Sequence, residues 1–129
     1  MDVGLDPRGG VLILRGELDY DSAVQLQEAA DDVLVDRPRL LVLDCTALHF
    51  CDSSGIGVLV RIYQRLAGYG GLLRLAAVPG SVARVFKLTG LDQAIAVCAT
   101  VADALAAGDG VRASSGEGAP VSVRAASER

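Results

Sequence analysis

Short apolar runs alternate with stretches of helical periodicity along most of this chain, and this alternation limits its fold more than any other feature. Helices that alternate with strands connect the strands of a largely parallel sheet. The sequence therefore predicts one α/β domain with four to five strands, the first of them antiparallel, and about four helices. The runs that indicate strands are a weak one near Val3 to Leu5, then Val11 to Leu14, Arg39 to Asp44, Leu72 to Ala76 and Ala94 to Val97.

The helices of this domain are marked by capping and termination signals. Ser22 to Gln25 has the spacing of a capping box and opens the first helix. A second helix begins near Ser54 and runs to Ala67, where three glycines follow within four residues. We expect the domain to span residues 1–107. Residues 108–129 carry Gly, Ala, Ser and scattered charge without periodicity, which predicts a disordered tail.

Composition and charge exclude several classes of partner. Although 51% of the residues are hydrophobic, the longest uncharged stretch, Gln93 to Ala102, is well short of the roughly 20 residues that a membrane-spanning helix needs. The first six residues contain no apolar signal-peptide core. A net charge of −4 argues against nucleic acid. We therefore expect a cytoplasmic protein that binds neither membrane nor nucleic acid.

The cysteines and the single histidine offer little metal or redox chemistry. Cys45, Cys51 and Cys98 form no CxxC pair, and His49 is the only histidine. A zinc site is therefore not expected, and the cysteines are interpreted as buried small hydrophobes in a reducing compartment. No metal or cofactor is predicted.

Charge is distributed unevenly along the chain. Between Glu17 and Asp36 there are seven acids and no base, whereas between Ser53 and Leu91 there are five bases and no acid. Such a pattern is typical of solvated helix faces, and it could also steer a charged protein partner onto one side.

The candidate functional segment is Asp52-Ser53-Ser54-Gly55-Ile56-Gly57, which opens the second helix after a short polar gap. Backbone N–H groups at a helix start lack helical partners and favour anions, so the segment could seat a phosphate. An alternative is that one of the three polar side chains, from Asp52 to Ser54, simply caps the helix.

Enzymatic interpretations of this segment fit poorly. A hydrolase could use only Ser53 or Ser54 with His49 and Asp44, but the GxSxG elbow is absent and His49 lies in the same loop. No P-loop motif occurs, and the dinucleotide fingerprint lacks its third glycine. A phosphoacceptor receiver domain would need a lysine after the last strand, where Cys98-Ala99-Thr100 stands instead. Regulated phosphorylation of serine remains, because a phosphoryl group there would change local charge without breaking the fold.

Three motifs at their expected spacing extend this interpretation. The stretches Gly16-Glu17-Leu18-Asp19, Leu43-Asp44-Cys45-Thr46 and Phe50 to Leu59 resemble the STAS domain of bacterial anti-sigma factor antagonists, the SpoIIAA-like family. The stretch Leu88 to Asp92 fits the end of the same pattern, so the resemblance runs from about Val11 to Leu105.

The resemblance implies a small α/β protein that binds an anti-sigma factor, itself an ATP-binding serine kinase, and so releases a sigma factor. The kinase would phosphorylate Ser53 and end the interaction, and a metal-dependent serine phosphatase would reverse the modification. The protein itself would be a substrate and not an enzyme.

Residue roles follow from the same resemblance. Asp52 would shape the acceptor site, Asp19 would approach it from a neighbouring loop and Ser54 would help to cap the helix. Gly55 would allow close approach of the kinase, with Ile56 part of the same partner-binding site. For Asp19, a simple role in starting the first helix stays open. A STAS-like scaffold that binds a protein or a nucleotide without any phosphorylation cycle also stays open.

Overall fold

The computed structural model describes residues 1–6 and 9–106, so the predicted tail at 108–129 lies outside the described residues. A five-stranded sheet with the order β1-β2-β3-β4-β5 forms its centre. β1 pairs antiparallel with β2, and the other neighbours are parallel. The predicted mixed α/β architecture is therefore confirmed. The strands are β1 (Asp2–Leu5), β2 (Val11–Leu18), β3 (Leu40–Cys51), β4 (Leu72–Ala76) and β5 (Ala96–Cys98).

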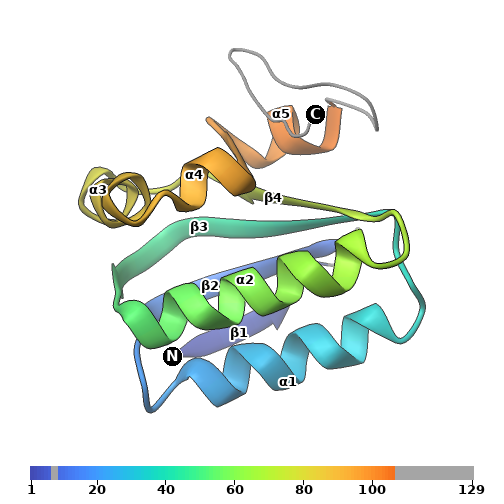
Figure 1. Cartoon of the computed structure of the whole chain (residues 1–129), viewed down its shortest axis with the longest axis horizontal. Helices are drawn as coiled ribbons and strands as arrows, with labels where there is room; N and C mark the ends of the chain where they lie inside the picture. The colour runs from blue at the N-terminus through green and yellow to red at the C-terminus, as the bar shows by residue number, and fades with distance from the viewer. Residues whose placement is uncertain (7–8, 107–129) are drawn as a thin grey trace.

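Helices cover the two faces of the sheet unequally. α1 and α2 lie side by side along one face (Figure 1), and α3 adds its buried Val82 and Phe86 to the same core. The short α5 packs its buried Ala104 against Val11 and Val42 on the other face. The single-turn α4 is additional to the four helices expected. The helices are α1 (Ala23–Leu34), α2 (Ser53–Ala67), α3 (Gly80–Thr89), α4 (Leu91–Ala94) and α5 (Val101–Ala106).

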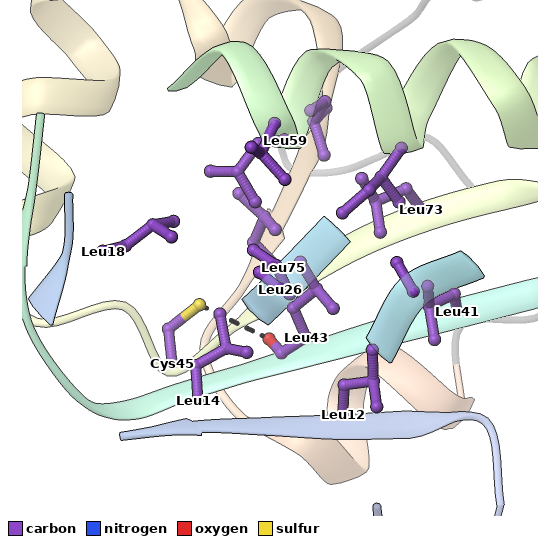
Figure 2. Packing of buried hydrophobic residues seen from close by; sticks show 14 of the residues in the cluster. Leu12, Leu14, Leu18, Leu26, Leu41, Leu43, Cys45, Leu59, Leu73 and Leu75 are labelled. Atoms are coloured by element: carbon purple, nitrogen blue, oxygen red, sulfur yellow. Dashed lines mark hydrogen bonds between the residues drawn. The ribbon is translucent and has the colours of Figure 1, made fainter. Parts of the chain in front are cut away.

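Alternate leucines of the central strands build the main core. Figure 2 shows the leucines of β2, β3 and β4 meeting those of α1 and α2. Aromatic side chains play a small part, since Phe86 is the one large aromatic residue fully buried among the described residues. Close packing of branched aliphatic side chains therefore supplies most of the hydrophobic stabilisation. The leucines drawn from the three strands are Leu12, Leu14, Leu41, Leu43, Leu73 and Leu75.

The second face of the sheet contains a buried charge. Arg74 on β4 is only 3% exposed, and its guanidinium donates a 2.7 Å hydrogen bond to the carbonyl oxygen of Ala104. A cation is favourable near carbonyl groups at the end of a helix. This contact ties α5 to the sheet.

β3 corrects the sequence interpretation of the segment before α2. The predicted strand ended at Asp44, but the observed strand continues to Cys51. Its pairing with β2 shifts register twice, so that β3 holds extra residues relative to β2. These bulges change the burial period: Cys45, Leu48 and Cys51 are buried three residues apart, while His49 and Phe50 are exposed. A strand with this spacing looks like a polar loop in the sequence.

Charged residues of α1 and α2 pair across the helix interface. Arg65 Nη1 lies 2.6 Å from Asp31 Oδ1, and Arg61 Nε donates to Gln27 Oε1 at 3.3 Å. Part of the uneven charge distribution thus serves contacts within the molecule, since α1 supplies the acid and α2 the base. Both ionic side chains are nearly half exposed, so the stabilisation is small.

The bulged register makes a direct prediction about two adjacent residues. Leu48 is fully buried, so Leu48→Ala should lower the free energy of unfolding by about 2–5 kcal/mol. His49 is exposed, so His49→Ala should change it by no more than about 0.5 kcal/mol. Urea unfolding of both variants followed by circular dichroism measures the difference. Equal stability of the two variants would contradict the extension of β3 through this segment.

Candidate functional site

The ends of β2 and β3 bring the predicted site residues together. Leu18 is paired with Cys51 in the parallel register, and the Asp52 N–H donates to the Leu18 carbonyl at 3.1 Å. Asp19 therefore follows one strand, and Asp52 with Ser53 follows its neighbour, at the same edge of the sheet. The start of α2 and the turn before α1 occupy one end of the molecule (Figure 1). This agrees with the rule that sites of open α/β sheets collect at the carboxyl ends of the strands.

Asp52 is the N-cap of α2. Its Oδ1 accepts hydrogen bonds from the backbone N–H of Ser54 at 2.9 Å and of Gly55 at 3.1 Å. The expectation that Ser54 helps to cap the helix is therefore wrong, because the carboxylate one position before the helix already holds these amides. The same two bonds also correct the idea of a free phosphate seat. Two of the N–H groups that would cradle an anion are already bonded to Asp52.

Ser53 is the first residue of α2 and its side chain is exposed. Among the described residues its hydroxyl makes no hydrogen bond. Ser54, by contrast, is half-buried. Of the two serines in the motif, Ser53 is thus the one whose hydroxyl a second protein can reach without any movement of the helix.

Gly55 is required by packing inside the molecule. A Cβ atom at this position would lie 2.7 Å from Leu18 Cγ, 2.8 Å from Cys51 Sγ and 2.9 Å from the Leu18 carbonyl oxygen. The residue is buried, so packing within the molecule already accounts for the glycine, and its role in the approach of a kinase stays a prediction. Its lack of a side chain lets α2 pack directly on the end of β2. Ile56, the next residue, is half-buried and packs against the main core.

Asp19 and Ser22 form a reciprocal pair that the sequence interpretation missed. Asp19 Oδ1 accepts from the Ser22 backbone N–H at 3.0 Å, and the Asp19 N–H donates to Ser22 Oγ at 2.9 Å. This is the geometry of a capping box with Asp19 at its start. The predicted box from Ser22 to Gln25 is not formed, since Ser22 makes no side-chain capping bond to α1. The sequence signal for this box was the spacing of Asp19 and Ser22, an aspartate three residues before a serine.

The Asp19 carboxylate is stabilised in its charged form. Hydrogen bonds from the Ser22 backbone N–H and hydroxyl hold the pKa of Asp19 below its usual value. Asp19 therefore does start the first turn before α1, and it also places a negative charge at the strand edge beside Asp52. These two roles of the residue do not conflict.

An open hollow of about 500 Å³ adjoins this edge on the β2 side. Three carboxylates and one imidazole line it, with no lysine or arginine among the lining residues. The N-terminal amino group of Met1 offsets part of this negative charge, and the remaining balance favours cationic or neutral groups over phosphates. The lining residues are Met1, Gly16, Glu17, Asp19, Asp21, Ser22, Gln25 and His49.

The cysteines behave as buried hydrophobes. Cys45 and Cys51 are both buried, and burial raises the pKa of each thiol to about 12. Among the described residues no group of three or more His, Cys, Asp or Glu side chains could hold a metal ion. Within the same residues no helix is long and apolar enough to cross a membrane.

Comparison with known proteins places this fold and site in a family. The model of the STAS domain matches residues 3–104, so the chain belongs to the STAS domain family. The anti-sigma-F factor antagonist RsfB of Mycobacterium tuberculosis is 35% identical over 97 residues, which cover 74% of this chain and 77% of RsfB.

Solved structures agree with the family assignment. An anti-sigma factor antagonist from Mycobacterium paratuberculosis is 31% identical with a TM-score of 0.71, covering 81% of this chain and 90% of that one. The phosphorylated form of the Bacillus cell fate determinant SpoIIAA shares the fold, with 23% identity and a TM-score of 0.63 over 81% of this chain and 96% of that one.

Two glycines of the same helix turn should respond in opposite directions to alanine. Gly55→Ala places a methyl group against backbone and side chain at under 3 Å and should destabilise the protein by about 1–3 kcal/mol. A Cβ atom at Gly57 would meet only Arg61 Nη1, at 3.5 Å. Gly57→Ala should therefore stabilise the folded protein by about 0.5–1 kcal/mol, because alanine lowers the backbone entropy of the unfolded chain. Thermal unfolding measures both. A neutral Gly55→Ala would show that α2 does not pack this closely on β2.

The raised thiol pKa values predict slow modification of the cysteines. At pH 8 the folded protein should react with Ellman's reagent at Cys45 and Cys51 at least about 100-fold more slowly than a free thiol, because the thiolate is the reactive form. In denaturing urea all three cysteines should react at the rate of free thiols. Rapid reaction of Cys51 in the folded protein would contradict its burial beneath α2.

Proposed function

We propose that this chain is an anti-sigma factor antagonist. In its unmodified form it binds an anti-sigma factor that is also a serine kinase, and this binding releases a sigma factor. Phosphorylation of Ser53 ends the interaction, and a serine phosphatase restores the active form. The family membership and the antagonist names of the relatives in the two Mycobacterium species support the proposal.

The observation that carries the proposal is the position of Ser53. Its hydroxyl is exposed at the first position of α2, and its backbone is fixed by the capped helix on one side and by β3 on the other. A kinase needs a hydroxyl held in a constant place and open to solvent. The Bacillus cell fate determinant SpoIIAA, which shares this fold, has a solved phosphorylated form, and this is in keeping with such a site.

The cap by Asp52 determines what a phosphate would do. A phosphoryl group on Ser53 carries about 1.5–2 negative charges. Because Asp52 Oδ1 already occupies the amides of Ser54 and Gly55, the phosphate cannot take these donors without breaking the cap. The charge of Asp52 also repels it from that side. The phosphate therefore extends from the surface, and the switch acts by charge at the interface and not by refolding.

Two exposed aromatic side chains close in sequence to the site residues offer contact area for a partner. Tyr20, next to Asp19, is 81% exposed, and Phe50, near the end of β3, is 48% exposed. Exposed aromatic residues are enriched in protein interfaces, where they contribute much of the binding energy. An aromatic contact next to a serine is well placed to be weakened by a new dianion.

A scaffold that binds nucleotides without a phosphorylation cycle is less compatible with the site. The hollow beside Asp19 is lined by Glu17, Asp19 and Asp21 and by no lysine or arginine. Nucleotide phosphates are usually held by free backbone amides or basic side chains. At the start of α2, two amides are held by Asp52, which leaves few donors for a phosphate.

Substitutions at Ser53 should separate binding from modification. Incubation with the serine-kinase anti-sigma factor from the same organism and ATP should add one phosphate to Ser53, as located by mass spectrometry. Ser53→Ala should bind that anti-sigma factor as tightly as the wild type and accept no phosphate. Ser53→Asp should weaken binding by about 1–3 kcal/mol, as calorimetry can measure, because it adds a charge at the interface.

Thr100→Asp is a matched control. Thr100 precedes α5, which covers the other face of the sheet, and its Oγ1 accepts from the Asp103 N–H at 2.9 Å. Aspartate caps helices equally well, so this variant adds the same charge without loss of structure. It should bind like the wild type. Equal affinity of wild type, Ser53→Ala and Ser53→Asp would reject the switch.

A further inference from the structure

We propose that Ser22 is a positioning residue, which holds the Asp19 carboxylate at the edge of the phosphorylation site so that it can meet the protein kinase. The proposal rests on the function proposed above and extends it to a residue outside the STAS motifs. It is carried by the geometry around one buried hydroxyl, which bonds both Glu17 at the end of β2 and Asp19 after it.

Ser22 is one of two buried polar or charged residues among those described, at 6% exposure. Its Oγ accepts the Asp19 N–H at 2.9 Å and lies 2.7 Å from the Glu17 carbonyl oxygen and 3.0 Å from Asp19 Oδ1. A hydroxyl has a single proton, so it donates either to Glu17 or to Asp19 at one time. Its lone pairs remain available for the Asp19 N–H. The Ser22 side chain therefore bonds both Glu17, near the end of β2, and Asp19, the residue that follows the strand.

The Glu17 carbonyl accepts from the Ser22 hydroxyl at a point where the sheet is irregular. The register between β2 and β3 shifts between Gly16 and Glu17, and Gly16 has a φ of +99°. Such a bulge interrupts the regular ladder. The 2.7 Å hydrogen bond from the Ser22 hydroxyl adds a contact that stabilises this bulged end of β2 in one conformation.

Ser22 also orients the Asp19 carboxylate. Both the Ser22 backbone N–H and its hydroxyl approach Oδ1 of Asp19, at 3.0 Å each. Neither bond involves Oδ2. Ser22 thus fixes the carboxylate through Oδ1, and the Asp21 backbone N–H and the charge of the N-terminal amino group also favour the ionised form. Asp19 and Ser22 both line the acidic hollow, where a basic side chain of the kinase would find a preoriented carboxylate.

A double-mutant cycle between Ser22 and Asp19 tests this role. In Ser22→Ala, the efficiency kcat/KM of Ser53 phosphorylation by the anti-sigma factor kinase should fall about tenfold, the effect of one misplaced charged hydrogen bond. Ser22→Thr retains the hydroxyl and should restore most of the rate. In an Asp19→Asn background, Ser22→Ala should have little further effect, because the carboxylate it positions is gone. Full additivity of the two substitutions would overturn the proposal.

A second readout does not depend on any kinase. NMR titration of the Asp19 carboxyl group should show its pKa rise part of the way toward the ordinary value of 3.8 in Ser22→Ala, which loses the hydroxyl bond and keeps the backbone N–H bond, and stay low in Ser22→Thr. An unchanged titration in Ser22→Ala overturns the positioning by Ser22, whether or not Ser53 is a substrate. If the wild type is not phosphorylated, the proposed function fails, and the titration still decides whether Ser22 controls Asp19.

Thr100→Ala separates positioning from general loss of stability. It removes a capping hydroxyl of α5, on the opposite face of the sheet. It should lower the melting temperature while leaving both the Asp19 titration and Ser53 phosphorylation at wild-type values. A drop in phosphorylation equal to that of Ser22→Ala would assign the effect to stability and overturn the proposal.

Discussion

The close contact between Gly55 and Leu18 determines where every group of the site lies. No side chain fits between them, so the first turn of α2 rests on the carboxyl end of β2. The hydrogen bond from the Asp52 N–H to the Leu18 carbonyl aligns the same two segments. Ser53 is thereby exposed two residues beyond the end of β3, and Asp19 is one residue beyond the end of β2. A larger residue at 55 would separate the helix from the sheet and move the serine relative to the acid.

The arrangement of charge at this edge follows from the same packing. Asp52 caps α2, so the positive end of the helix dipole is already matched by a carboxylate. Asp19 adds a second negative charge that its hydrogen bonds with Ser22 keep ionised. A phosphate on Ser53 would therefore meet two acids and no free amide of the Ser54–Gly55 pair. Such a modification would change the charge of the surface strongly and leave the fold beneath it unchanged.

Much of the fold could be predicted from the sequence, since the strands in the interior carry uninterrupted apolar runs. β4 is predicted at its observed bounds, Leu72 to Ala76, because both of its faces are covered. The carboxyl end of β3 could not be predicted, because bulges replace the alternation of two with a spacing of three, and the end of β2 carries only one apolar residue after Leu14. The polar residues between Cys45 and Cys51 then resemble a loop. The irregular strands are the ones that form the site.

The site itself could be predicted in part. Asp19, Asp52 and Ser53 were expected together because parallel strand ends share an edge, and the register of β2 and β3 agrees. The contact of Gly55 with Leu18 could not be predicted, because it depends on packing between a helix and a strand distant in sequence. Asp52, and not Ser54, caps α2. Ser22 was assigned to the wrong helix cap, since Asp19 begins the turn three residues earlier.

The most direct test of the charge-only switch is amide hydrogen exchange of the chain carrying phosphoserine at position 53, introduced during synthesis so that no kinase is needed. If Asp52 keeps its cap, the amides of Ser54 and Gly55 remain as protected as in the unmodified chain, and the helix is unchanged. Loss of protection at both amides would contradict the claim that phosphorylation leaves the fold intact. Transfer of either amide hydrogen bond from Asp52 to the phosphate would contradict it too.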